Sequence, residues 1–424
     1  MEQLFLVIGL MIFMFILNFP MYIALIVPPL VMIYVYYPNI LPFMMTQQLI
    51  GGVATQALLA VPLFIFAADI MSAGQTSKRL IDLVEVFVGH IHGGLAITTA
   101  AACTFFGAIS GSTQATLVAI GRPMKDRLVK AGYNNDQTLA LIESSAIIDL
   151  LIPPSISMIM YCVVTGASVG DLFIAGFIPG FCMLGIFSIY LYFSARRLKI
   201  PRKKRATIRD IIMAIKNGIA PMGFPFIIFA GIYSGIFSPT EAAAVAVLYA
   251  TICEVFLYKS VKLKQFKDIA LSTGVVTTAV FILVSAGCLL SWVISYARLP
   301  QIIAETVLGT DPTAMRVLIT ATIFFFISGM FVDSLVAIVI LTPIFYTPAI
   351  VAGIHPIHFG VLVVLQAAIA SISPPFGCNI FTACAIFDQP YIVAVRKLAP
   401  YMIMLIIVTV LIIAFPQISL FLII

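Results

Sequence analysis

The chain has 424 residues, of which 62% are hydrophobic and only 9% are charged. Soluble globular domains carry about 25% charged residues, so this chain has too little polar surface to fold as a soluble globule. The composition therefore indicates a polytopic membrane protein. The formal net charge of +6 does not indicate nucleic-acid binding, because the basic residues are clustered in short stretches between apolar runs.

Apolar runs long enough to cross a membrane follow one another along the chain. A crossing needs about 20 apolar residues. Residues 4–37 are too many for one crossing and include Asn18 and Pro20, so two crossings are predicted there. No Lys or Arg precedes Lys78, so this run lacks the basic flank of a signal peptide and is expected to be retained. Further crossings are predicted at residues 49–71, 138–164, 172–193, 211–237, 242–258, 269–296, 361–386 and 398–424.

Two remaining segments, 93–121 and 313–345, contain two copies of one motif. The sequences AISGSTQATLVAI, from Ala108, and FISGMFVDSLVAI, from Phe326, share Ile-Ser-Gly and Leu-Val-Ala-Ile in the same register. The repeat continues beyond the motif, because an Ala-Gly pair and a Pro-Pro pair follow in each half. The sequence therefore contains an internal repeat.

Clusters of basic residues predict how these segments are oriented, because cytoplasmic loops are enriched in Lys and Arg. Residues 196–205 hold seven basic residues and residues 259–267 hold four, so both are expected in the cytoplasm. Counting crossings from these stretches predicts that 93–121 enters from the cytoplasm and 313–345 from the opposite side. Such an inverted-topology repeat is typical of many secondary transporters. Residues expected on the outer side include Arg298, Glu305 and Asp311.

Small and hydroxylated residues at the two predicted hairpin tips indicate ion binding. Backbone without helical partners is tolerated in a membrane where it lines a cavity. Ser and Thr hydroxyls add oxygen donors suited to a hard cation such as Na⁺. Pro153-Pro154 and Pro374-Pro375 interrupt apolar runs, which frees carbonyl groups and exposes helix N-termini. The alternative is that Ser and Gly only permit close helix packing, but this explains the duplicated register less well.

These motifs resemble the large membrane subunit, of DctM type, of TRAP (tripartite ATP-independent periplasmic) transporters over essentially the whole chain. The resemblance implies an importer of organic acids with Na⁺ as coupling ion and no organic cofactor. It also implies a bacterial inner-membrane location, a small four-helix membrane subunit and a periplasmic substrate-binding protein as partners, and a transport domain that moves as an elevator. Membrane lipids are expected contacts, and nucleic acid is not. The motifs are FFGAISGS, AGY, LIPPSISMIMY, SPTEAAAVAVLYA, MFVDSLVAIVILTPI, IHPIHFGVLVV and SPPFG.

We therefore predict an all-α polytopic membrane protein with an inverted-topology repeat, two re-entrant helical hairpins, broken helices and an elevator-type architecture. Hairpin tips are expected at residues 110–112 and 328–330, and breaks at residues 153–154 and 374–375. The predicted segments are N-terminal scaffold helices (1–92), a first transport repeat (93–195), a basic loop with scaffold helices (196–268), a scaffold helix with a connecting arm (269–312), a second transport repeat (313–390) and a C-terminal helix (391–424).

Candidate site residues come from both repeats. The resemblance assigns Na⁺ contacts to Ser110, Gly111, Ser112, Ser328, Gly329, Ser373 and Pro374. The chemistry of the residues adds Asp149, Pro153 and Asp333 to this Na⁺ set. Solute contacts are expected from Thr116, Ser155, Gly377 and Asn379.

The chain departs from the family pattern at two positions. Family members often carry Asp where this chain has Thr116, and Gly where it has Asp149. A buried carboxylate is costly unless it is paired, so we interpret Asp149 as supplying the negative charge that Thr116 cannot. The alternative is that Asp149 lies near a water-filled vestibule and only tunes the local potential.

Other polar motifs receive structural interpretations. The run from Gly166 to Gly170 fits the serine-hydrolase pattern G-x-S-x-G, but it joins two apolar runs rather than a strand and a helix. Glu241 is expected to cap a helix, while Glu143 and Asp69 are expected to be interfacial or paired. The histidines at 90, 92, 355 and 358 are expected at the membrane interfaces. The seven cysteines are scattered without metal-ligand spacing and are interpreted as core residues.

Two other classes of function stay open at this point. A self-contained ion-coupled carboxylate transporter would show the same hairpins without needing a binding protein. An intramembrane enzyme would need a nucleophile and base or a metal motif, and neither H-E-x-x-H nor a credible Ser/His pair occurs in the sequence. The solute, whether sialic acid, a C4-dicarboxylate or another sugar acid, is not indicated by this chain.

Overall fold

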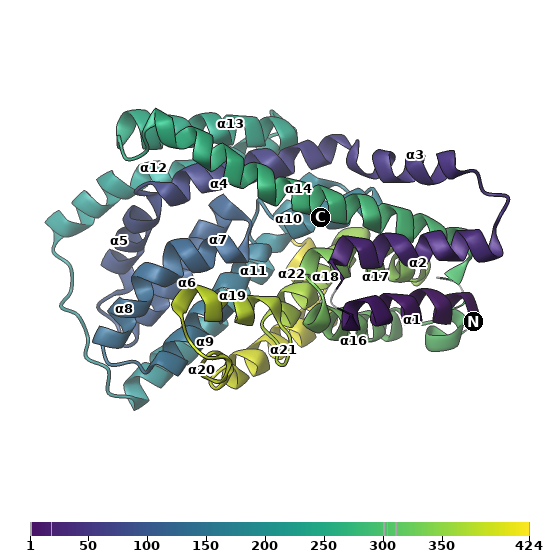
Figure 1. Cartoon of the computed structure of the whole chain (residues 1–424). Helices are drawn as coiled ribbons and strands as arrows, with labels where there is room; N and C mark the ends of the chain where they lie inside the picture. The colour runs from purple at the N-terminus through teal and green to yellow at the C-terminus, as the bar shows by residue number, and fades with distance from the viewer. Residues whose placement is uncertain (1, 18, 300–301, 303, 310–311, 424) are drawn as a thin grey trace.

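The structure is a computed structural model that describes residues 2–17, 19–299, 302, 304–309 and 312–423. All regular elements in these residues are helical, and Figure 1 shows them packed lengthwise into an elongated bundle. Within this described part of the chain, seven helices are long and apolar enough to cross a membrane, judged by length and composition. Asn18 and Asp311, which figured in the predicted topology, lie outside the described residues.

The described residues of 2–88 form a succession of helices. As predicted, the first apolar run is two helices, α1 and α2, which pack against each other. The third predicted crossing is divided at Ala54 and Thr55. The helices are α1 (Glu2–Ile16), α2 (Met21–Tyr36), α3 (Pro42–Val53), η1 (Gln56–Leu59), α4 (Ala60–Ala73) and α5 (Thr76–Val88).

The first hairpin consists of α6 (Gly94–Ser110) and a return arm that runs from α7 (Thr113–Thr116) through a π-helical turn into α8 (Arg122–Lys130). Its tip is at Gly111, where φ is +58°. Residues with a Cβ rarely adopt this left-handed conformation, so glycine suits the turn. The tip therefore lies where the Ser-Gly-Ser motif predicted it.

The first broken helix lies beside this hairpin. It consists of α9 (Asn135–Ala146), the 3₁₀ turn η3 (Ile147–Leu150) and α10 (Ile156–Thr165). Proline has no N–H group for helical hydrogen bonds, and the helix is interrupted around Pro153 and Pro154 as predicted.

The second hairpin turns later than predicted. Its helices are α16 (Ala314–Phe331) and α17 (Ser334–Val351), so the tip is at Val332 and Asp333 rather than at residues 328–330. Gly329 stays helical, and a Cβ there would lie 2.6 Å from the Ala370 Cβ. This glycine therefore permits close packing on α18 (Pro356–Ser371) instead of forming the turn.

The remaining C-terminal part also differs from the prediction. After the break at Pro374 and Pro375, α19 (Cys378–Phe387) follows. The single helix predicted for 391–424 is three, because Pro400 begins a new helix and Pro416 follows the end of that helix. These helices are α20 (Tyr391–Val395), α21 (Ala399–Ala414) and α22 (Gln417–Leu420).

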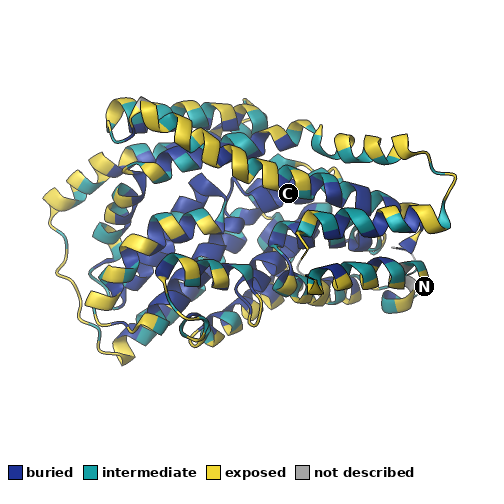
Figure 2. Ribbon diagram, in the orientation of Figure 1, coloured by how far each residue is buried: buried dark blue, intermediate teal, exposed yellow. Residues whose placement is uncertain are grey.

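Long helices connect and surround the two hairpins. They are α11 (Val169–Arg197), α12 (Ile208–Tyr233), α13 (Pro239–Thr251) and α14 (Leu263–Tyr296). Figure 2 shows buried residues gathered along α6, α9, α10 and α18, with exposed residues on outer helices such as α3 and α12. No residue of α3 is buried, whereas 15 residues of α18 are. The exposed outer side chains are largely apolar, as a lipid environment requires.

A network of charges joins α5 to two other segments. Arg127 of α8 and Lys203 of the loop after α11 each form an ion pair with a different oxygen of Glu85. Burial raises the pKa of Glu85, but hydrogen bonds from Lys203 and Arg127 outweigh it and hold this pKa below its ordinary value of 4.5. Glu85 therefore links the return arm of the first hairpin to α5.

We expect Glu85→Gln to lower the melting temperature of the purified protein by about 1–3 °C, because the two cations lose their shared partner. The contribution should be present above pH 4.5 and lost as the pH falls through the lowered pKa of Glu85. Thermal unfolding in detergent checks this, and 1 M KCl should reduce the difference from wild type. Asp126→Asn, an exposed neighbour of Arg127, is the control. Equal effects of the two variants would contradict the role of Glu85.

Candidate ion and solute site

The tip of the first hairpin packs directly against the first break. A Cβ on Gly111 would clash with the carbonyl oxygen of Pro154, and one on Gly107 would clash with the backbone and Cβ of Asp149. Side chains at either glycine would therefore force the two elements apart. The tip and the break pack this closely because both positions lack a Cβ.

A buried polar cluster lies at this contact and consists of Ser110, Thr116 and Asp149. The Thr116 hydroxyl donates a hydrogen bond to Asp149 Oδ2 at 2.8 Å, and Ser110 Oγ lies 3.2 Å from Thr116 Oγ1. Asp149 is fully buried, and its Oδ1 has no hydrogen-bond partner among the described residues. A buried carboxylate with an unpaired oxygen is costly in an apolar interior.

The donors in this Asp149 cluster suit a hard monovalent cation. Carboxylate and hydroxyl oxygens are the ligands that such cations prefer, and one carboxylate balances one positive charge. Ser112 lies at the tip, where its N–H donates to Ser110 Oγ at 3.4 Å, and Pro153 lies within the buried break. The structure therefore brings the predicted Na⁺ residues of the first half together.

The predicted Na⁺ residues of the second half are arranged differently. Asp333 caps α17, since its Oδ1 accepts a hydrogen bond from the Leu335 N–H at 2.9 Å. Ser328 and Gly329 lie in the last turns of α16, before the tip. The Ser373 hydroxyl donates to the Ile369 carbonyl oxygen at 2.7 Å.

The second break is also more open than the first. Pro374 is exposed, as are the next two residues, whereas residues 151–155 of the first break are all buried. The two repeats therefore share a sequence motif without sharing one site geometry.

A hydrogen-bonded chain connects the first hairpin to the second broken helix. The Thr113 hydroxyl donates to Asn379 Oδ1 at 3.0 Å, and Asn379 Nδ2 donates to Ser371 Oγ at 2.9 Å. All three side chains are buried. Sequence reasoning identified Asn379 but missed Thr113 and Ser371. The sequence signal for Thr113 is its position directly after the Ser-Gly-Ser motif, and Ser371 has no such signal.

A cavity of about 340 Å³ lies between the two tips, the two broken helices and α14. Small-molecule sites occupy about 300–1,000 Å³, so the volume suits a small solute. Asp333 is the charged residue among those that line it, and no Lys or Arg is among them. The polar lining residues are Ser112, Thr113, Gln114, Ser157, Asp333, Ser334, Cys378 and Asn379.

Of the four predicted solute contacts, Asn379 lines this cavity and three do not. Thr116 is buried in the Asp149 cluster, where it is hydrogen-bonded to Asp149. Ser155 caps α10, where its hydroxyl oxygen accepts a hydrogen bond from Met158 N–H at 3.3 Å. Gly377 packs against the backbone of the second break, beside Ser371.

Two interpretations of polar motifs outside the site are supported by the structure. Glu241 and Ser238 form the two hydrogen bonds of a capping box at the start of α13, which confirms the capping role. Ser168, within the hydrolase-like pattern, caps α11 by accepting a hydrogen bond from Asp171 N–H at 3.2 Å.

Two further polar side chains lie inside the protein. Glu143 is fully buried and neither carboxylate oxygen has a hydrogen-bond partner among the described residues, so the expectation that it could be paired is wrong. His358 is also buried, with Nδ1 at 2.6 Å from the Ser419 hydroxyl. Both side chains lie inward because α9 and α18 are covered by other helices, which apolar patterning alone does not indicate.

Comparison with known families gives one match over nearly the whole chain. The family model described as "Tripartite ATP-independent periplasmic transporter, DctM component" matches residues 8–418. This match confirms the resemblance inferred from the sequence motifs.

Curated relatives cover most of the chain. It is 50% identical to the ectoine TRAP transporter large permease protein TeaC of Halomonas elongata, over 89% of this chain and 88% of that protein. It is 48% identical to the ectoine/5-hydroxyectoine TRAP transporter large permease protein UehC of Ruegeria pomeroyi, over 97% of this chain and 96% of that protein. It is 34% identical to the C4-dicarboxylate TRAP transporter large permease protein DctM of Pseudomonas aeruginosa, over 86% of this chain and 85% of that protein.

The fold is similar to that of a solved transporter structure. The YdaH transporter of Alcanivorax borkumensis superposes with a TM-score of 0.62 at 15% identity, over 88% of this chain and 87% of that one. This likeness supports the all-helical polytopic fold. Together with the family match, it shows that the chain is a transporter permease of the bacterial inner membrane and not an enzyme. The chain belongs to the DctM family, the large permease subunits of TRAP transporters.

Proposed function

We propose that this chain is the Na⁺-coupled permease subunit of a TRAP importer for ectoine or a closely similar zwitterion. The buried Asp149 carboxylate, with one unpartnered oxygen beside two hydroxyl groups, is the observation that supports the coupling ion. A single Na⁺ at this cluster balances the charge of Asp149 without a protein cation.

Na⁺ binding would hold the first hairpin and the first break together. Ser110 and Thr116 come from the hairpin, while Asp149 comes from the turn before the break. A cation bound by all three stabilises their contact and removes the cost of the uncompensated carboxylate. The hairpin and the break then move as one unit. The paired hairpins and breaks support re-entrant segments in an inverted repeat, with elevator-like movement of these elements against the outer helices.

The solute assignment changes from the organic acid that the sequence motifs implied. The names of the two relatives near 50% identity specify ectoine, whereas the relative at 34% is a C4-dicarboxylate permease. Ectoine carries both a cationic amidinium ring and a carboxylate, so its net charge is zero. A cavity with Asp333 and without a basic lining residue suits an amidinium group better than a dianion.

The partners follow from the tripartite organisation of the family. We propose a periplasmic binding protein that delivers the solute, and a small membrane subunit. Exposed apolar side chains on α1 and α2 support a subunit contact at these helices. The alternative, a self-contained transporter, needs neither partner.

For the coupling ion, we expect Asp149→Asn to raise the Na⁺ concentration for half-maximal uptake by about tenfold, equivalent to a loss of about 1.4 kcal/mol. The double variant Asp149→Asn with Thr116→Asp should recover part of this loss. Thr116 contacts Asp149 Oδ2, so a carboxylate at position 116 lies in the same cluster. Uptake against Na⁺ concentration in proteoliposomes measures both effects. Asp268→Asn, at an exposed position, is the matched control. An unchanged Na⁺ curve for Asp149→Asn would remove this residue from the coupling site.

For the solute, we expect alkylation of Cys378 by a small thiol reagent to block uptake, since this thiol lines the cavity beside Asp333. Saturating ectoine should slow the alkylation and succinate should not. Cys378→Ser should make uptake insensitive to the reagent, while Cys384→Ser, on the same helix outside the cavity lining, should leave the sensitivity in place. Protection by succinate and not by ectoine would instead favour a dicarboxylate.

For the partners, we expect uptake to fall to background when either the binding protein or the small membrane subunit is left out of the proteoliposomes. The physical reason is that the cavity alone offers one charged side chain for recognising a small solute. Uptake at the full rate by this chain alone would identify a self-contained transporter.

A further inference from the structure

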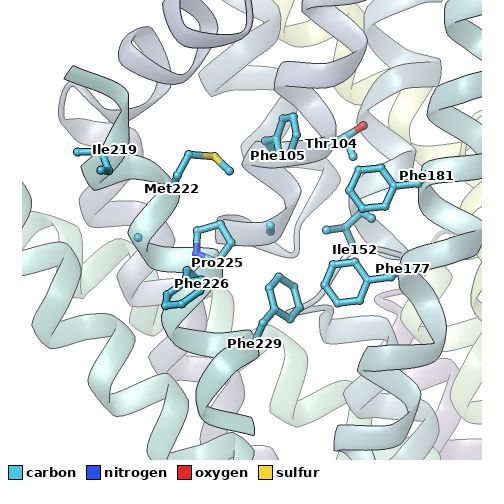
Figure 3. Close-up of a pocket in the computed structure, with 12 residues that line it drawn as sticks. Thr104, Phe105, Ile152, Phe177, Phe181, Ile219, Met222, Pro225, Phe226 and Phe229 are labelled. Carbon is cyan, nitrogen blue, oxygen red and sulfur yellow. The ribbon is translucent and has the colours of Figure 1, made fainter. Parts of the chain in front are cut away.

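A second cavity, separate from the solute cavity, lies between α6, α11 and α12. Its volume is about 480 Å³. Figure 3 shows the rings of Phe105, Phe177 and Phe229 around a common space. The polar side chain in the wall is Thr104, and its hydroxyl already donates to the Ala100 carbonyl oxygen at 2.9 Å. The wall therefore offers no free side-chain hydrogen-bond donor, and one hydroxyl oxygen is its whole side-chain polarity.

The outer edge of this cavity meets the surface that faces the membrane. Ile219 and Phe226 of α12 line it and are 66% and 72% exposed. Both α11 and α12 are long and apolar enough to cross a membrane. Water is a poor occupant, because a buried water needs two to four polar partners. The apolar wall therefore fits a hydrocarbon ligand better than a polar one.

The dimensions distinguish a lipid chain from a protein helix. Lining residues on α12 run from Ile219 to Phe229, which is about 15 Å along the helix at 1.5 Å per residue. The empty space between the walls, with the open mouth included, is about 960 Å³, and over this length it gives a mean cross-section of about 64 Å², or a width of at most about 9 Å. An α-helix with its side chains is about 10–12 Å wide. A helix of a partner subunit is too wide, whereas a single extended hydrocarbon chain fits.

We propose that this cavity binds one acyl chain of a membrane phospholipid. The acyl chain would separate α12 from the proposed ion-binding cluster. The inner wall of the cavity includes Ala108, two residues before Ser110, and Ile152, next to Pro153. Lipid in this position fills the gap between an outer helix and the first hairpin with its break. Its contacts are non-directional, so the two surfaces can slide without breaking hydrogen bonds.

The test uses phosphatidylethanolamine with a diazirine midway along one acyl chain. The full chain is reconstituted with its partner subunits in vesicles that contain this lipid, irradiated, and mapped by mass spectrometry. Adducts on the inner residues Phe177 and Phe229 are expected. Met222→Trp should lower their yield by about tenfold, because the larger side chain fills the space. Met213→Trp, at an exposed position of α12 outside the cavity, should leave the yield unchanged.

Adducts confined to Ile219 and Phe226 would show lipid against the outer surface only and would overturn the proposal. A photoreactive benzoylphenylalanine at Met222 provides a second readout. Lipid adducts there support the acyl chain, while crosslinks to the small membrane subunit would show that a protein partner occupies the cavity. The wild-type adduct map decides the question even if Met222→Trp does not fold.

Discussion

The rest of the site depends on one buried carboxylate. Asp149 lies in the short turn before the first break, is fully buried, and has one oxygen bonded to Thr116 and the other unpartnered among the described residues. The arrangement needs close approach of two backbones, and glycine at positions 107 and 111 permits it. A charge in this place is tolerable only with a counter-charge. This requirement is the physical basis of the proposed cation coupling.

The two halves of the chain share a repeated sequence motif but differ in structure at the corresponding positions. The first half holds the closed, carboxylate-centred cluster, while the second half holds an exposed break and a carboxylate that caps α17 and lines the cavity between the tips. Thr113 and Asn379 join the halves through a buried hydrogen bond. Because Thr113 lies three residues from Thr116, the Asp149 cluster and the cavity between the tips share one hairpin. The proposed coupling between ion and solute therefore has a short structural route.

The first hairpin is held by contacts at the apolar exterior as well as by its polar interior. The outer helices expose side chains such as Phe226 and Ile219 that only lipid or partner subunits can cover. Contacts between α12 and the first hairpin are interrupted by a cavity with an apolar wall. The Glu85 ion pairs hold the return arm of the same hairpin to α5. The hairpin thus combines a directional ionic contact with a non-directional apolar one.

The sequence by itself determined the all-helical membrane class, the first tip and both breaks. Apolar run length, glycine in a left-handed turn and proline without an N–H are local constraints that act in any fold. It did not determine the second tip, because Ser328 and Gly329 resemble a turn until α18 packs against Gly329. Nor could it show that Thr113 meets Asn379, or that Thr116 lies beside Asp149 and not in the cavity. The tertiary structure decided these contacts, because they join segments distant in the chain and depend on how the helices pack.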